Sequence, residues 1–132
     1  MPTVISYAVA LVAFGALDAV WLTSMGPRLY RPTLGDIVLP AVNWLPAVLF
    51  YLVYAAGLVV FAINGALARD SVAHAATMGA LFGVIAYATY DLTNYATLRN
   101  WTLTLTLADM AWGAVASAIA AAVSAAVTRA VT

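Results

Sequence analysis

The chain has 132 residues, of which 66% are hydrophobic and only 8% are charged, and its mean hydropathy is +1.01. A soluble domain is about half apolar and about a quarter charged, so the composition indicates that lipid is the main solvent. The five arginines balance the five aspartates, and there is no lysine, glutamate or cysteine. No basic surface is therefore available for nucleic acid, and thiol catalysis, disulfides and cysteine-ligated metals are excluded.

Four stretches are long enough to cross a bilayer, whose hydrocarbon core of about 30 Å requires about 20 apolar residues in a helix. Helices are expected rather than strands, because the backbone must satisfy its own hydrogen bonds in lipid. The sequence therefore predicts an all-α integral membrane four-helix bundle, with residues 1–132 forming a single domain. The predicted helices cover residues of about 3–24, 41–63, 71–98 and 102–127.

The segments at the ends of these helices need separate interpretation. The N-terminal stretch lacks the basic leader of a signal peptide, so we interpret it as a retained first span. Residues 25–40 contain two glycines and three prolines, which predicts a loop. Residues 102–108 alternate threonine and leucine like a strand, but we predict the start of the fourth helix, because a lone strand cannot cross lipid.

Three of the five aspartates fall inside the predicted helices, whereas Asp36 and Asp70 fall in loops. Asp18 lies near the end of the first helix, Asp91 near the end of the third and Asp109 near the start of the fourth. Because successive helices run in opposite directions, all three should lie about 9–11 Å inside the same membrane face. An aspartate in lipid usually faces the bundle interior, so we expect one shared layer of carboxyl groups.

Other polar residues are expected to extend this layer. On the third helix Gly79, Tyr87 and Asn94 share a stripe with Asp91, and Gly79-x-x-x-Gly83 matches a close-packing motif of membrane helices. Arginines at the same membrane face can reach inward to carboxylates or outward to lipid phosphates. The candidate ligand-binding residues are Asp18, Asp91, Asn94, Asp109, Arg28, Arg99, Asn43, Tyr87 and Tyr95.

Two interpretations of the acidic layer remain open. It can be structural, with each carboxylate paired to an arginine or capping a neighbouring helix. It can be functional, as acids inside a membrane usually are, and three acids in a low-dielectric layer cannot all ionise unpaired. The single histidine, His74, is at the opposite face without a partner at helical spacing, so we expect no metal site and no cofactor.

Three segments carry a family resemblance: TYDLTNYATLRNW at Thr89–Trp101, ALDAVWL at Ala16–Leu22 and ADMAWG at Ala108–Gly113. Together they resemble a family of small bacterial membrane proteins known as domain of unknown function 2177. The resemblance implies a four-helix, multi-pass protein of the bacterial inner membrane. It supplies no activity, and no catalytic residue is carried over from it.

The leading functional hypothesis is a membrane protein that binds or transports a small ligand or ion in an aspartate-lined pocket. A cationic ligand, a proton or a divalent ion would suit such a pocket, and a transport path would favour a homo-oligomer. One alternative is a membrane-embedded enzyme, or an enzyme's accessory subunit, acting on lipids, so whether the chain is an enzyme stays open. A third is a structural or assembly protein. A closed and fully paired acidic layer would favour structure, and an open cavity would favour binding.

Overall fold

A computed structural model describes residues 1–132, and its long elements are all helical, with no strand. Four helical spans are long and apolar enough to cross a membrane. The predicted four-helix membrane architecture is therefore confirmed. In chain order, the α-helices are α1 (Pro2–Met25), α2 (Arg31–Leu34), α3 (Trp44–Leu58), α4 (Asn64–Arg69), α5 (Val72–Thr97) and α6 (Leu103–Val131).

The segment expected to be a loop after the first span is helical for most of its length. A π-helical turn at Gly26–Tyr30 joins α1 to α2, and a short 3-10 turn at Gly35–Ile37 follows. Pro27 and Pro32 lie inside this continuous helical path, each near the start of one of its segments, and each removes one backbone N–H donor from the helix. The helical path ends only at Gly35, whose φ of +62° is accessible to glycine.

The second and fourth spans also differ in detail from the expected limits. The second span begins at Trp44 and continues through a π-helical turn at Val59–Ile63 into α4, which ends where Asp70 adopts a left-handed φ of 51°. Because the span begins at Trp44, Pro46 lies in the first turn of α3, where the backbone N–H that proline lacks would have no helical partner. The alternating threonine–leucine segment is the start of α6, and the Thr102 hydroxyl caps it by accepting from the Leu105 N–H at 3.1 Å.

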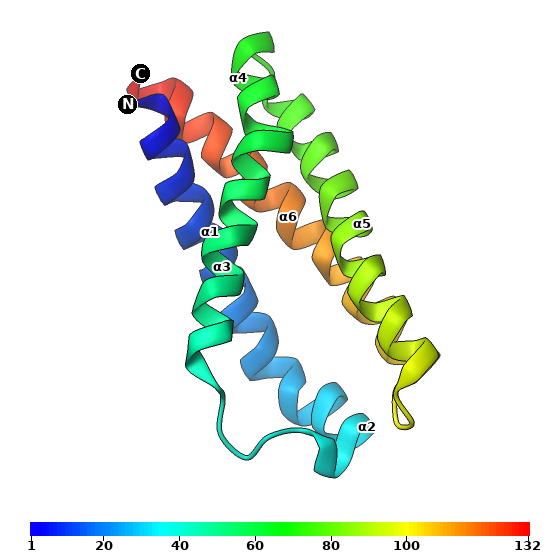
Figure 1. Cartoon of the computed structure of the whole chain (residues 1–132). Helices are drawn as coiled ribbons and strands as arrows, with labels where there is room; N and C mark the ends of the chain where they lie inside the picture. The colour runs from blue at the N-terminus through cyan, green and yellow to red at the C-terminus, as the bar shows by residue number, and fades with distance from the viewer.

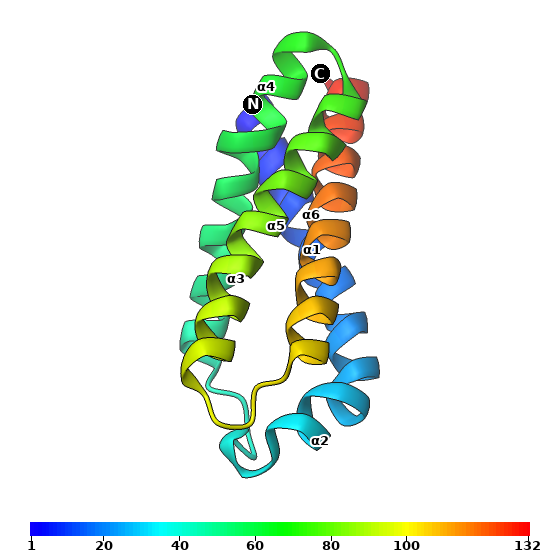
Figure 2. The ribbon, with the colours of Figure 1, turned by 90° about the vertical axis from the view of Figure 1, so that its right-hand side faces the viewer.

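Figure 1 shows that both chain termini lie at one end of the bundle, with α4, whereas α2 and the α5–α6 connection lie at the other. Helices α5 and α6 pack together along their length (Figure 2). Glycine makes this approach possible: a Cβ at Gly79 would lie 2.7 Å from the Ser117 carbonyl oxygen, and one at Gly83 would overlap the Gly113 carbonyl.

The bundle is tightly packed toward the termini and open at the other end. The apolar core includes Ala10, Ala62 and Ala120, small residues that let the helices approach closely. Helix α3 packs on α1, whereas α5 meets the second span mainly through Val59–Ile63 and α4. The first turns of α3 therefore separate from the last turns of α5, as Figure 1 shows.

Candidate functional site

A cavity of about 690 Å³ lies among α1, α3, α5 and α6, in the half of the bundle where these helices separate. Most of its wall is apolar, and its acidic groups are two of the aspartates inside the spans. Its lining residues are Asp18, Leu22, Tyr30, Pro46, Ala47, Phe50, Tyr54, Ala86, Tyr87, Tyr90 and Asp109. The combination of an apolar wall with a few converging polar groups is typical of small-molecule sites.

Asp18 joins three helices through its carboxylate. The side chain is only 6% exposed, and it lies on α1 about two turns before the end of that helix. The Tyr51 hydroxyl of α3 donates to its Oδ2, and the Trp112 indole N–H of α6 donates to its Oδ1 at 3.0 Å. The aspartate is therefore held by neutral donors from two neighbouring spans.

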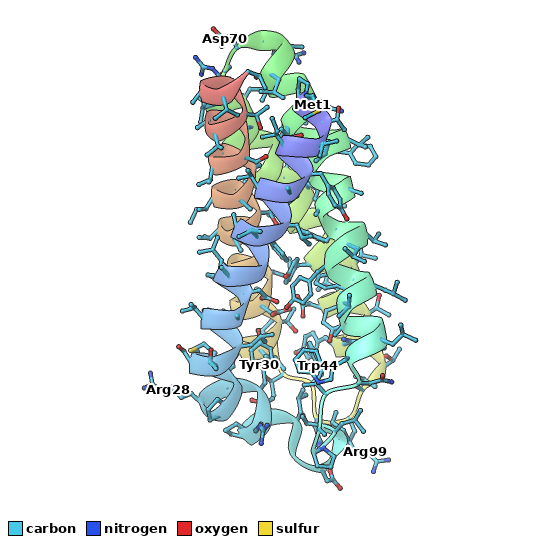
Figure 3. All side chains as sticks on the ribbon, turned by 90° about the vertical axis from the view of Figure 1, so that its left-hand side faces the viewer. Met1, Arg28, Tyr30, Trp44, Asp70 and Arg99 are labelled. Atoms are coloured by element: carbon cyan, nitrogen blue, oxygen red, sulfur yellow. The ribbon has the colours of Figure 1, made fainter.

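Asp109 is held in a similar way from the first span. It is also 6% exposed, and it accepts a hydrogen bond from the Tyr30 hydroxyl, which receives one from the Trp21 indole N–H at 2.7 Å. Figure 3 shows Tyr30 directed into the bundle. The Trp21 ring stacks on Trp112 with centroids 4.7 Å apart and planes at 4°, so the supports of Asp18 and Asp109 form one aromatic network.

The aromatic network links two copies of the same short sequence pattern, an aspartate followed three residues later by a tryptophan. Asp18 and Trp21 share the Asp-x-x-Trp spacing of Asp109 and Trp112. In the structure the tryptophan of each pair supports the aspartate of the other pair, directly for Asp18 and through Tyr30 for Asp109. The spacing is therefore a signal in the sequence that could have found both tryptophans.

Asp91 has a different environment from the other two acids. It is fully buried on α5, and neither of its carboxyl oxygens accepts a hydrogen bond from a protein donor. Its carboxyl group lies beside that of Asp109. Two carboxyl groups can bond to each other only when they share a proton, because an ionised carboxylate has no donor. Asp91 does not line the cavity, but it lies beside Asp109, which does.

No arginine pairs with any of these three acids. The ion pair of the structure joins Arg129 and Asp70 at 2.7 Å, at the end of the bundle that holds the termini. Arg28 and Arg99 are exposed, and Figure 3 shows both directed away from the helices. The acidic layer therefore contains carboxyl groups and neutral donors but no cationic side chain.

The structure brings together only part of the predicted site. Asp18, Tyr87 and Asp109 line the cavity, and Asp91 lies beside Asp109 without lining it. Asn94 is partly buried outside the cavity, and the other four candidates are exposed and lie outside it; they are Arg28, Asn43, Tyr95 and Arg99. They occupy the helix ends and connections, beyond the level at which the four helices surround the pocket.

Tyr30 and Tyr51 were not expected in the site, although each donates to an aspartate. Tyr30 falls in the segment interpreted as a loop, and its position depends on the helical continuation of α1. Tyr51 lies on a span without an inward-facing acid, so no polar stripe marks it in the sequence. No three histidine, cysteine or acidic side chains are grouped so that they could hold a metal ion. The apolar wall and the two carboxyl groups of the cavity suit an organic ligand that can donate hydrogen bonds.

Comparison with known proteins gives no match among curated proteins and none among solved structures. The family model described as "Predicted membrane protein (DUF2177)" matches residues 3–126. The match covers most of the chain, including the second and third spans, most of the first and fourth, and every residue of the pocket. The chain is a multi-pass membrane protein that belongs to this DUF2177 family.

Proposed function

We propose that this protein binds a small ligand carrying a cationic group in the pocket formed by Asp18 and Asp109. The observation that carries the proposal is a cavity of about 690 Å³ lined by two carboxyl groups, with no basic side chain on its wall. Small-molecule sites in proteins span roughly 300–1,000 Å³, so the cavity is large enough for an organic cation. We further propose the bacterial inner membrane as its location, because helical bundles of this kind are typical of that membrane.

The electrostatics of the acidic layer support a cation. A carboxylate offers about four acceptor positions, and Asp18 uses two of them on Tyr51 and Trp112. The remaining positions can accept hydrogen bonds from a ligand. A buried carboxylate without a counter-charge is costly in a low-dielectric medium. A bound cation would reduce this cost, and a neutral ligand of the same size would not.

The carboxyl group of Asp91, which is buried without a protein donor, supports exchange of the ligand for a proton. Two adjacent buried carboxyl groups without a counter-charge are expected to hold one proton between them. A cation that approaches Asp109 would compete with that proton, so binding should release it. A purely structural layer would be closed and fully paired, whereas this layer borders an open cavity and includes an acid without a protein donor. Transport coupled to this exchange would require a path larger than one four-helix chain, which favours a homo-oligomer.

The test is a titration of the full chain in lipid nanodiscs with butylamine. Binding is monitored by tryptophan fluorescence, because Trp21 and Trp112 belong to the network that holds the two aspartates. Asp18→Asn and Asp109→Asn should each weaken binding by about 10-fold or more, since each removes a charge-assisted hydrogen bond. The control Asp36→Asn changes the same side chain at an exposed position outside the pocket and should bind normally.

A second comparison keeps the test decisive if an aspartate variant fails to fold. On the unmodified protein, butylamine should bind at least about 10-fold more tightly than butanol, which has a similar size and no charge. Equal binding of amine and alcohol would refute the cationic ligand. Undiminished binding of butylamine to folded Asp18→Asn and Asp109→Asn would refute the site.

A further inference from the structure

A second hollow of about 550 Å³ adjoins the pocket on the side of α3 that faces α5. Its exposed wall contains no polar surface. The two cavities share Phe50 and Tyr54, so they are neighbours along the second span. The residues that line this apolar groove are Leu49, Phe50, Val53, Tyr54, Gly57, Phe61 and Phe82.

The groove follows the axis of the second span and is open on one side. Its lining runs from Leu49 to Phe61, which at 1.5 Å per helical residue is about 18 Å. Leu49 and Phe61 are exposed large apolar residues, so a membrane around the bundle would meet the groove directly. The groove therefore leads from the acidic pocket to the region that acyl chains occupy.

We infer that the ligand is a cationic amphiphile with a single alkyl chain, whose head group lies at Asp18 and Asp109 and whose chain lies in the groove. This inference rests on the proposed function and adds the class of ligand. All the charge of the combined cavity is at one end, and the other end is wholly apolar. An amphiphilic molecule matches that distribution, whereas a compact polar cation would leave the groove unused.

The groove determines which ligands fit, and it adds little to the binding free energy of the alkyl chain. An alkyl chain gains little by leaving lipid for an apolar protein surface, because lipid tails are equally apolar. A head group bound at the aspartates nevertheless requires a route for its chain out of the bundle. The separation of α3 from α5 supplies that route and lets the ligand enter sideways from the membrane. A short amine needs only the pocket, so it should not depend on the groove.

The bottom of the groove depends on Gly57. A Cβ at this position would lie 2.6 Å from Cζ of Phe82, so the ring of Phe82 occupies the space that a side chain would take. The ring lies against Tyr54 at 5.1 Å and stacks on Phe61 at 5.9 Å between centroids. These aromatic contacts give the groove a wall that is continuous from the pocket to Phe61.

The experiment fills the groove and compares two chain lengths. Val53→Trp places a large ring in the groove from the outer surface, where Val53 is 70% exposed, so the core is not disturbed. Val12→Trp is the matched control, because Val12 on α1 is also 70% exposed and lies outside both cavities. Dodecylamine and butylamine are titrated into nanodiscs of each variant, with partition into protein-free nanodiscs subtracted.

Val53→Trp should weaken dodecylamine binding by at least about 10-fold and leave butylamine binding unchanged, and Val12→Trp should change neither. Equal dodecylamine affinity in Val53→Trp and Val12→Trp would overturn the groove assignment, even if butylamine binds as proposed. Failure of butylamine to bind the unmodified chain would instead overturn the proposed function. A photoreactive group at the end of the dodecyl chain should label Leu49 or Phe61, and labelling confined to residues outside the groove would also overturn the inference.

Discussion

At the scale of single residues, the buried acids are held by aromatic donors rather than by arginines. Tyr51 and Trp112 donate to Asp18, and Tyr30 donates to Asp109. Neutral donors stabilise a carboxylate without cancelling its charge, so the negative potential remains available to a ligand. An arginine in the same place would have formed a closed ion pair and favoured a purely structural role.

Tyr51→Phe should lower the free energy of unfolding by about 1.5–3 kcal/mol, because it removes a hydrogen bond to a buried carboxylate. The matched control is Tyr95→Phe, which changes an exposed tyrosine outside the pocket and should shift stability by less than about 0.5 kcal/mol. Thermal unfolding in detergent micelles measures both. Equal stability of the two variants would show that the Tyr51 hydroxyl does not support Asp18.

The proton that we propose Asp91 and Asp109 to hold between them would give the binding reaction a pH dependence of definite sign. The proton and the cationic ligand compete for the same carboxyl groups, so the affinity for butylamine should fall as the pH is lowered. The pH range is chosen so that butylamine itself stays fully protonated. Titrations at several pH values measure this trend. Asp91→Asn should flatten it, because the amide supplies a fixed N–H donor to Asp109 in place of the exchangeable proton. An affinity that does not change with pH in the unmodified chain would contradict the exchange.

At the scale of the elements, the site depends on a departure from regular helix in the first span and on a close contact between two helices. The π-helical turn at Gly26–Tyr30 lets α1 continue past Pro27 and carries Tyr30 to Asp109. The close contact of α5 with α6, made possible by Gly79 and Gly83, sets the position of Asp91 beside Asp109. Small shifts in either element would therefore separate the acids from their partners.

Gly83→Ala should destabilise the bundle by about 1–3 kcal/mol, since the added methyl group would overlap the Gly113 carbonyl on α6. Gly15→Ala is the control: no atom lies within 4 Å of a Cβ there, and alanine favours a helix more than glycine does. Thermal unfolding of both variants measures the difference. A Gly83→Ala variant as stable as Gly15→Ala would mean that α5 and α6 can separate without cost.

At the scale of the whole molecule, the bundle has two unlike ends. The termini and α4 lie at the packed end, and α2 and the α5–α6 connection lie at the end that is open (Figure 1). Arg28, Arg31 and Arg99 are exposed at the open end. Three arginines there against two at the other end favour a cytoplasmic position for the open end under the positive-inside rule.

The arrangement predicts that Thr132 and Arg99 face opposite sides of the membrane. The chain contains no cysteine, so Thr132→Cys and Arg99→Cys each introduce a single thiol. An impermeant maleimide added to intact cells should label the first and not the second, and both should react after the membrane is permeabilised. Labelling of both positions from the same side would contradict the topology.

The sequence by itself determined the solvent and the number of spans, because the apolar length of a helix depends on local chemistry alone. It also predicts a common depth for the three acids from their spacing along the helices. It could not determine the partners of those acids. The donors to Asp18 lie 33 and 94 residues away, and the donor to Asp109 lies 79 residues away. Such contacts depend on how each helix rotates and where neighbouring helices separate. Only the tertiary structure decides both, and it therefore also decided that a pocket is present and that the predicted arginines lie outside it.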